Sequence, residues 1–133
     1  MRKQINSIFV YLFFIACWIF FFYFYPYHLH YKEQITLCVL QPDFLQTYLQ
    51  KPAFLTEICG DYLTQFFLWT GGGSSILTLT FVFTWLGLRI ALRKTGITSH
   101  VSLWALLPIV AEWALSCHLE YPLSMSLGLM CSV

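Results

Sequence analysis

Charge is what this sequence of 133 residues has least of. Asp, Glu, Lys and Arg together make up 10% of the chain, against 59% hydrophobic residues. So few charges cannot cover a water-soluble globule of this size, so lipid is the expected solvent for much of the surface. The basic residues are scattered and the net charge is +1, which argues against a nucleic-acid partner. The expected partners are the lipid bilayer and a second membrane protein or copy of this chain.

Phosphate-binding and metal-binding motifs are also missing. The glycine run "TGGGSS" at 70–75 lacks the lysine of a P-loop, and we interpret it as a hinge whose Ser74 or Ser75 caps the next helix. The five cysteines have no metal-ligand spacing. Only Cys38 and Cys59 share one outer segment, where a disulfide and two free thiols are both possible. No cofactor is expected.

Long apolar runs are what the sequence has in abundance. The run from Ile8 to Tyr25 holds 18 residues without a charge, and as a helix it would span about 27 Å, close to the bilayer core of about 30 Å. Two further runs cover 75–92 and 101–117, the last interrupted by Pro108. We therefore predict an all-α, polytopic membrane protein with three transmembrane helices. The apolar segment 123–133 is an incomplete fourth.

The first run has the basic start of a signal peptide, Arg2 and Lys3. Polarity should then return soon after a cleavage site near Cys17. The sequence instead stays apolar to Tyr25, which favours a retained signal anchor over a cleaved peptide. Pro26 cannot continue the helix, and the tyrosines around it suit the headgroup layer, so this region is interpreted as a membrane exit.

The basic residues predict the orientation. Five of the seven lie at the start of the chain and in the second connection, which places both in the cytoplasm under the positive-inside rule. The first long loop and the segment "HLEYP" at 118–122 are then periplasmic, in a bacterial inner membrane. The five residues are Arg2, Lys3, Arg89, Arg93 and Lys94.

The outer segment 27–73 is too apolar for a loop surrounded by water. Its stretch 52–67 has apolar residues on one helical face and polar residues on another, which predicts an amphipathic helix lying in the interface. A shorter interfacial helix is expected from Asp43, a good N-cap, to Pro52. No internal repeat or linker divides the sequence, so residues 1–133 are treated as one membrane unit.

Two carboxylates are candidate catalytic or transport groups. Glu112 lies inside an apolar segment, where an unpaired charge is costly. It fits a proton or cation site, or a neutral side chain bonded to a hydroxyl on a neighbouring helix. Glu33 lies just above the expected membrane surface, where a general base would suit transfer from a lipid-linked donor.

Two sets of residues point to binding or packing. Three histidines and an acid are expected on the outer side, where they would either bind a metal or act as amphipathic anchors at the headgroups. A stripe of small residues on the second crossing is typical of a helix-packing face. The first set is His28, His30, His118 and Glu120, and the second is Thr80, Thr84, Gly87 and Ala91.

Three stretches carry a resemblance to a known family. They are "YPYHLHYKEQ" (25–34), "FLTEICGDYLTQFF" (54–67) and "LLPIVAEWALSCHLEYPLSMSLGL" (106–129). Their order resembles the start of a family of unknown function whose members are large multi-pass inner-membrane proteins of Bacteroides-type bacteria. The glycines at 71–73 depart from the aromatic break expected there. The resemblance implies no established reaction, so it assigns no catalytic residue.

The leading hypothesis is a structural role. The chain is expected to be a truncated or separately encoded N-terminal helix-packing module of a larger membrane assembly, without enzymatic activity of its own. One alternative is part of a polytopic glycosyltransferase-like enzyme that uses lipid-linked donors, with Glu33 as base; this is an analogy of architecture alone. The other is a small transporter or channel subunit, with Glu112 as its intramembrane site.

Overall fold

The computed structural model describes residues 2–35, 46, 48–96, 100–118 and 120–133, and within these ranges helix is the only regular secondary structure. The all-α prediction is therefore confirmed. The elements in chain order are α1 (Arg2–Tyr23), α2 (Pro26–Ile35), α4 (Phe54–Thr64), the 3-10 helix η1 (Gln65–Leu68), α5 (Gly72–Lys94), α6 (Val101–Trp104), α7 (Leu106–Ser116) and α8 (Leu123–Ser132).

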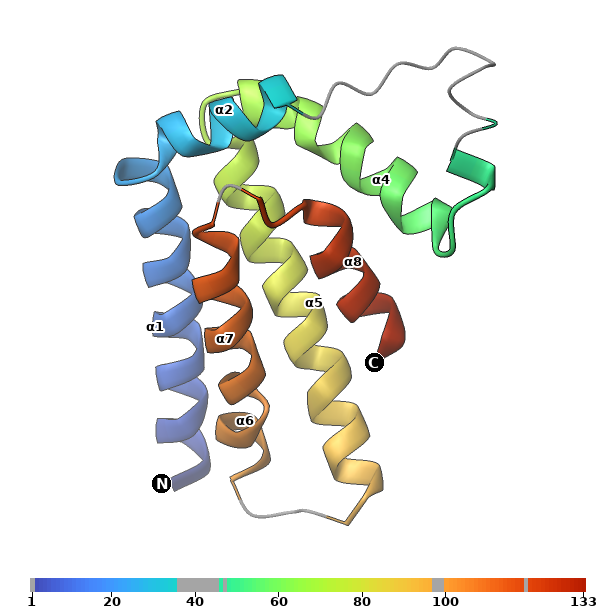
Figure 1. The fold of residues 1–133 in the computed structure, drawn as a ribbon. Helices are drawn as coiled ribbons and strands as arrows, with labels where there is room; N and C mark the ends of the chain where they lie inside the picture. The colour runs from blue at the N-terminus through green and yellow to red at the C-terminus, as the bar shows by residue number, and fades with distance from the viewer. Residues whose placement is uncertain (1, 36–45, 47, 97–99, 119) are drawn as a thin grey trace.

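The long helices α1 and α5 form a bundle with α7 and α8, and α2 and α4 lie across one end of it (Figure 1). Buried residues recur every three or four positions on the facing sides, as expected for packed helices. Aromatic rings fill much of the space: the centroids of Phe14 and Trp85 are 5.9 Å apart, and those of Phe21 and Phe81 are 6.3 Å apart. The core joins α1, α5, α7 and α8.

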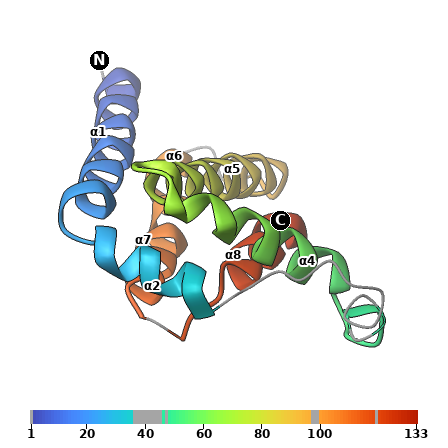
Figure 2. The same ribbon diagram turned by 90° about the horizontal axis from the view of Figure 1, so that it is seen from above.

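Pro26 ends one helix and begins another. α1 stops at Tyr23, and α2 starts at Pro26 after a turn of two residues. Proline suits a first helical position because the N–H that it lacks would have no partner there. The sequence does not predict α2, since the tyrosine-rich stretch fits a membrane exit equally well. Figure 2 shows that α2 crosses over the end of α7.

The start of α5 differs from the prediction. The helix begins at Gly72, because Gly71 adopts a left-handed conformation with a φ of 85°, and no serine side chain caps it. Ser74 instead donates its hydroxyl to the carbonyl of Gly71 at 3.0 Å. A Cβ on Gly73 would lie 3.0 Å from side-chain atoms of both Leu29 and Phe67. The glycine run thus also allows α2 and η1 to approach α5 closely.

The third expected crossing is broken into α6 and α7. The break falls at Ala105, three residues before Pro108, whose ring would clash with the carbonyl of Trp104 in a continuous helix. By length and composition, two stretches described by the structure are able to cross a membrane, Asn6–Tyr23 and Gly72–Lys94.

The predicted interfacial helix is present as α4, but it packs on α8. Gly60 permits the contact, because a Cβ there would lie 2.8 Å from the Cα of Ser124. The single continuous helix expected over 52–67 becomes α4 followed by η1, whose Phe67 is buried. The helix expected to begin at Asp43 has its start outside the described residues.

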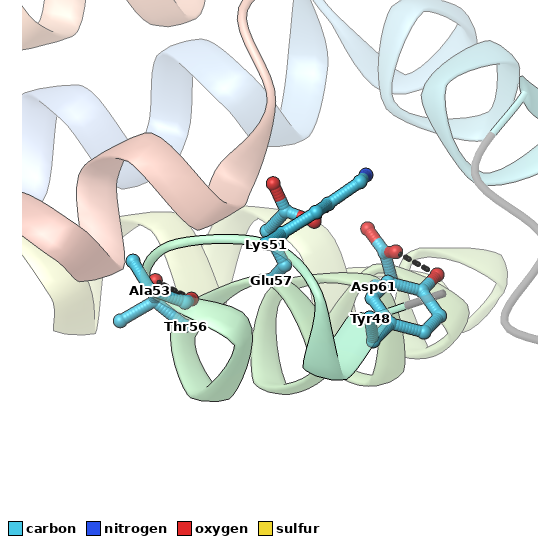
Figure 3. A network of polar contacts seen from close by, with 6 residues as sticks. All are labelled: Tyr48, Lys51, Ala53, Thr56, Glu57 and Asp61. Carbon is cyan, nitrogen blue, oxygen red and sulfur yellow. Dashed lines mark hydrogen bonds and ion pairs between the residues drawn. The ribbon is translucent and has the colours of Figure 1, made fainter. Parts of the chain in front are cut away.

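The acids of α4 have partners close to them in the chain (Figure 3). Tyr48 donates its hydroxyl to Asp61 at 2.5 Å, and Lys51 forms an ion pair with Glu57 at 2.9 Å. These contacts fasten the preceding turn to α4. The two acids therefore have structural roles at α4.

The close approach at Gly60 predicts a difference between two glycines. Gly60→Ala should lower the free energy of unfolding by about 1–3 kcal/mol, because the methyl group meets the backbone of α8. Gly128→Ala is the matched control, because nothing lies within 4 Å of a Cβ at that helical position. It should raise the free energy by up to about 1 kcal/mol through helix propensity. Unfolding followed by circular dichroism tests both; equal stabilities would contradict the α4–α8 contact.

Candidate functional site

A buried lysine joins α2 to the end of α7. Lys32 is only 8% exposed, and its Nζ donates hydrogen bonds to the carbonyls of Ser116 at 2.9 Å and Tyr121 at 3.1 Å. The last carbonyls of a helix have no partner within it, and the helix dipole favours a cation at this end. Lys32 therefore fixes α2 over the end of α7.

Glu112 lies one turn before this end and is 2% exposed. Its backbone carbonyl accepts a hydrogen bond from the hydroxyl of Ser116 at 2.9 Å. Its Oε1 is buried and finds no hydrogen-bond donor in the described part of the chain. The hydroxyl of Ser126 on α8 is fully buried beside this carboxylate. A carboxylate on α7 and a hydroxyl on α8 therefore meet inside the fold.

Tyr121 lies between Lys32 and this pair. Burial raises the pKa of its phenol; the neighbouring Ser126 hydroxyl partly offsets the effect, and the Glu112 carboxylate adds to it. Its backbone carbonyl accepts one of the two hydrogen bonds of Lys32. We name these four residues, Lys32, Glu112, Tyr121 and Ser126, the buried polar cluster.

Burial has a large effect on Lys32 itself. It lowers the pKa of the ammonium from 10.5 to about 8, and the nearby Cys117 opposes the shift. Burial also lowers the pKa of His28, and the positive charge of Lys32 adds to that effect. Lys32 and His28 thus lie close together at the end of α7, and the pKa of each is lowered.

The structure separates the histidines of the expected metal site. His28 and His118 lie near each other, but His30 faces a different cavity, beside Phe67 and Gly73. Residues two apart on a helix point about 200° away from each other, so the helical form of α2 divides the pair. Glu120 is exposed beside His118. No group of three or more His, Cys, Asp or Glu in the described ranges is arranged to hold a metal ion.

The remaining predicted residues fall in three places. Glu33 lies on α2, but its side chain is outside the described part, so its role as a base stays a prediction. Cys38 also lies outside the described residues, and its pairing with Cys59 stays open. Thr80 and Thr84 are buried on α5 and bond to carbonyls of their own helix.

The other half of the small-residue stripe approaches the end of α8. A Cβ on Gly87 would lie 2.9 Å from Val133, and Ala91 is half-buried. The burial of Lys32 is not among the predictions from the sequence. The feature of the sequence that could have predicted this burial is the helical spacing from Leu29, three residues earlier, which puts the lysine on a buried face.

A family model described as a family of unknown function (DUF6057) matches residues 1–133. The chain belongs to this family. The expected membership of a family of unknown function is therefore confirmed, whereas the match says nothing of membranes, protein size or source. No curated protein and no solved structure matches this DUF6057 chain. Its chemistry must be argued from its own residues.

Substitution of two lysines of this DUF6057 chain should have contrasting effects on its stability. Lys32→Met should lower the free energy of unfolding at pH 7 by about 1–3 kcal/mol, because two buried carbonyls lose their donor. Lys51→Met removes an ion pair whose side chains are 50% and 31% exposed, and should change it by less than about 1 kcal/mol. Thermal unfolding of the purified variants measures both.

The same two variants also test how the stability of the fold depends on pH. Lys32 has a pKa of about 8 in the fold against 10.5 for an ordinary lysine, so between these values the unfolded chain binds more protons than the folded one. The free energy of unfolding should therefore rise with pH across this window. Lys51→Met should retain the rise and Lys32→Met should lose it. An identical slope in both variants would contradict the burial of Lys32.

Proposed function

We propose that this chain is a multi-pass unit of a bacterial inner-membrane protein, in which α1, α5 and the broken α6–α7 segment cross the bilayer. Its role is structural: it supplies packed helices and an outer interfacial layer to a larger assembly, with the lipid bilayer and a second membrane protein or another copy as partners. The observation that carries the proposal is the apolar outer surface of the bundle.

The two longest helices have too little cover for the core of a water-soluble protein. Only 22% of Asn6–Tyr23 and 28% of Gly72–Lys94 is buried inside the fold. A continuous band of large apolar side chains on the outside of a bundle is stable in lipid and costly in water. The exposed apolar residues of α1, α5 and α7 include Ile8, Phe9, Leu12, Ile15, Ile19, Leu79, Phe83, Leu86, Ile90, Leu107, Val110 and Leu115.

The orientation is supported by the arrangement of the bundle. The start of α1 and the end of α5 lie at one end, and α2 and α4 lie at the other (Figure 1). Arg89, Arg93 and Lys94 belong to the first end, together with the basic start of the chain. Such a distribution favours a cytoplasmic N-terminus and a periplasmic layer formed by α2 and α4.

A partner surface is supported by the exposed side of α8. Met125 is 60% exposed and Leu129 is 39% exposed, and both border a cavity of about 410 Å³ between α8 and the start of α4. An apolar helix face beside a hollow suits a helix of another subunit. The stripe of Thr80, Thr84 and Gly87 packs within the chain itself.

Cysteine labelling tests the proposed topology. In a chain with all five cysteines replaced by alanine, Gln50→Cys and Thr95→Cys each introduce one thiol at an exposed position at opposite ends. A maleimide that cannot cross membranes should label Gln50→Cys in spheroplasts, and Thr95→Cys only after lysis. Labelling of both before lysis, or recovery of the chain in the supernatant after carbonate extraction, would overturn the proposal.

A transport role is the second candidate, favoured by Glu112. Its carboxylate is buried, with Oε1 lacking a donor in the described part of the chain, and the hydroxyl of Ser126 on α8 lies beside it. A carboxylate in such a setting suits a site that takes up a proton or a cation during transport. Lys32 lies close to the same end of α7.

Proton flux into proteoliposomes tests this second role. The unaltered chain should relax an imposed pH gradient, and Glu112→Gln should abolish the effect because the amide cannot ionise. Glu57→Gln is the control, since that acid is paired with Lys51 on the outer layer. Equal flux for both variants, or no flux above empty vesicles for the unaltered chain, would eliminate the transport role.

A further inference from the structure

A polar cavity lies at the end of the bundle opposite the buried polar cluster. It has a volume of about 360 Å³, within the range of about 300–1,000 Å³ typical of small-ligand sites. The start of α1, the last turns of α5 and the start of α6 surround it. Its polar lining is Asn6, Ser7, Arg89, Arg93, His100 and Ser102.

Neither arginine of this cavity forms an ion pair with an acid among the residues that the structure describes. Arg89 and Arg93 lie one turn apart on α5, so both guanidinium groups belong to one side of the helix. The sequence has no Asp or Glu in residues 1–32 or 62–111, the two stretches that supply the whole lining. The cavity therefore has a positive potential and favours an anion.

Arg89 is held in place by an aromatic ring. Its Cζ lies 5.2 Å from the centre of the Trp85 ring, and the indole N–H of Trp85 donates to the carbonyl of Ser102 at 3.1 Å. The Nε of Arg89 is buried and has no acceptor among the described residues. A guanidinium held against an aromatic ring in this way loses little side-chain freedom when its terminal N–H groups bind an oxyanion.

His100 supplies a further donor. The amide Nδ2 of Asn6 lies 3.2 Å from Nδ1 of His100. An imidazole in this contact keeps its second ring nitrogen, Nε2, for a hydrogen bond to a ligand. His100 also has a φ of 54°, an uncommon conformation for a residue other than glycine, and such strain is concentrated at binding sites.

We propose that this cavity binds a phosphate group, carried by a soluble compound or by the headgroup of an anionic lipid, with Arg89 and Arg93 as its main ligands. Donors from two arginines, a histidine and a serine exceed what the two oxygens of a carboxylate require, and they suit the several oxygens of a phosphate. This chemistry does not depend on a membrane position for the chain. A lipid source would place the site at the cytoplasmic headgroups.

Isothermal titration calorimetry on the full chain in dodecyl maltoside tests the site. The two probes are inorganic phosphate and dihexanoyl phosphatidylglycerol, and the unaltered chain should bind at least one of them saturably. Arg89→Gln and Arg93→Gln should each weaken that binding about tenfold or more through loss of charge-assisted hydrogen bonds. Lys94→Gln removes the same charge from the same helix outside the cavity, and should change the affinity less than about twofold.

The outcomes distinguish a soluble phosphate compound from a lipid headgroup, and each of these from a site that binds no phosphate. Saturable binding of phosphate identifies a soluble ligand, and binding of the lipid alone identifies a headgroup. Arg93 is exposed, so Arg93→Gln should keep the circular dichroism spectrum of the unaltered chain even if Arg89→Gln does not. Absence of saturable binding for both probes, an unchanged affinity in Arg93→Gln, or an equal loss in Lys94→Gln would overturn the proposal.

Discussion

The hydrogen bonds of the Lys32 ammonium at the end of α7 are the contact on which the position of α2 over the bundle depends. A buried charge is costly unless it is hydrogen-bonded, and here two carbonyls accept from it while the dipole of α7 favours it. The contact fixes α2, whose Leu29 then approaches Gly73 at the start of α5. One side chain thus links the turn after α1 to both α5 and α7.

Close backbone approach is the second constraint. Gly73 admits α2 and η1 to the start of α5, and Gly60 admits α8 to α4. Gly87 has the same relation to Val133 near the other end of α8. Side-chain packing across these short backbone separations holds the helices against one another. The small residues therefore define how the helices are arranged.

The polar groups inside the bundle divide into two kinds. Thr80 and Thr84 bond to carbonyls of their own helix, so they are satisfied wherever that helix lies. Glu112 and Ser126 are also buried, but they come from different helices, and the Ser126 hydroxyl of α8 lies beside the Glu112 carboxylate of α7. Polar groups of this second kind depend on how the helices are assembled.

The sequence by itself determined the helical class, the two long apolar helices and the amphipathic character of α4, because each follows from local periodicity and run length. It also placed the break near Pro108, where a missing N–H acts locally. It did not predict α2, the early start of α5, the separation of His28 from His30, or the burial of Lys32. These depend on which surfaces meet. A lysine in a tyrosine-rich stretch fits a solvent-exposed loop and a buried helix face equally well. Only the approach of α7 and of the segment after it brings the two carbonyls that accept its hydrogen bonds.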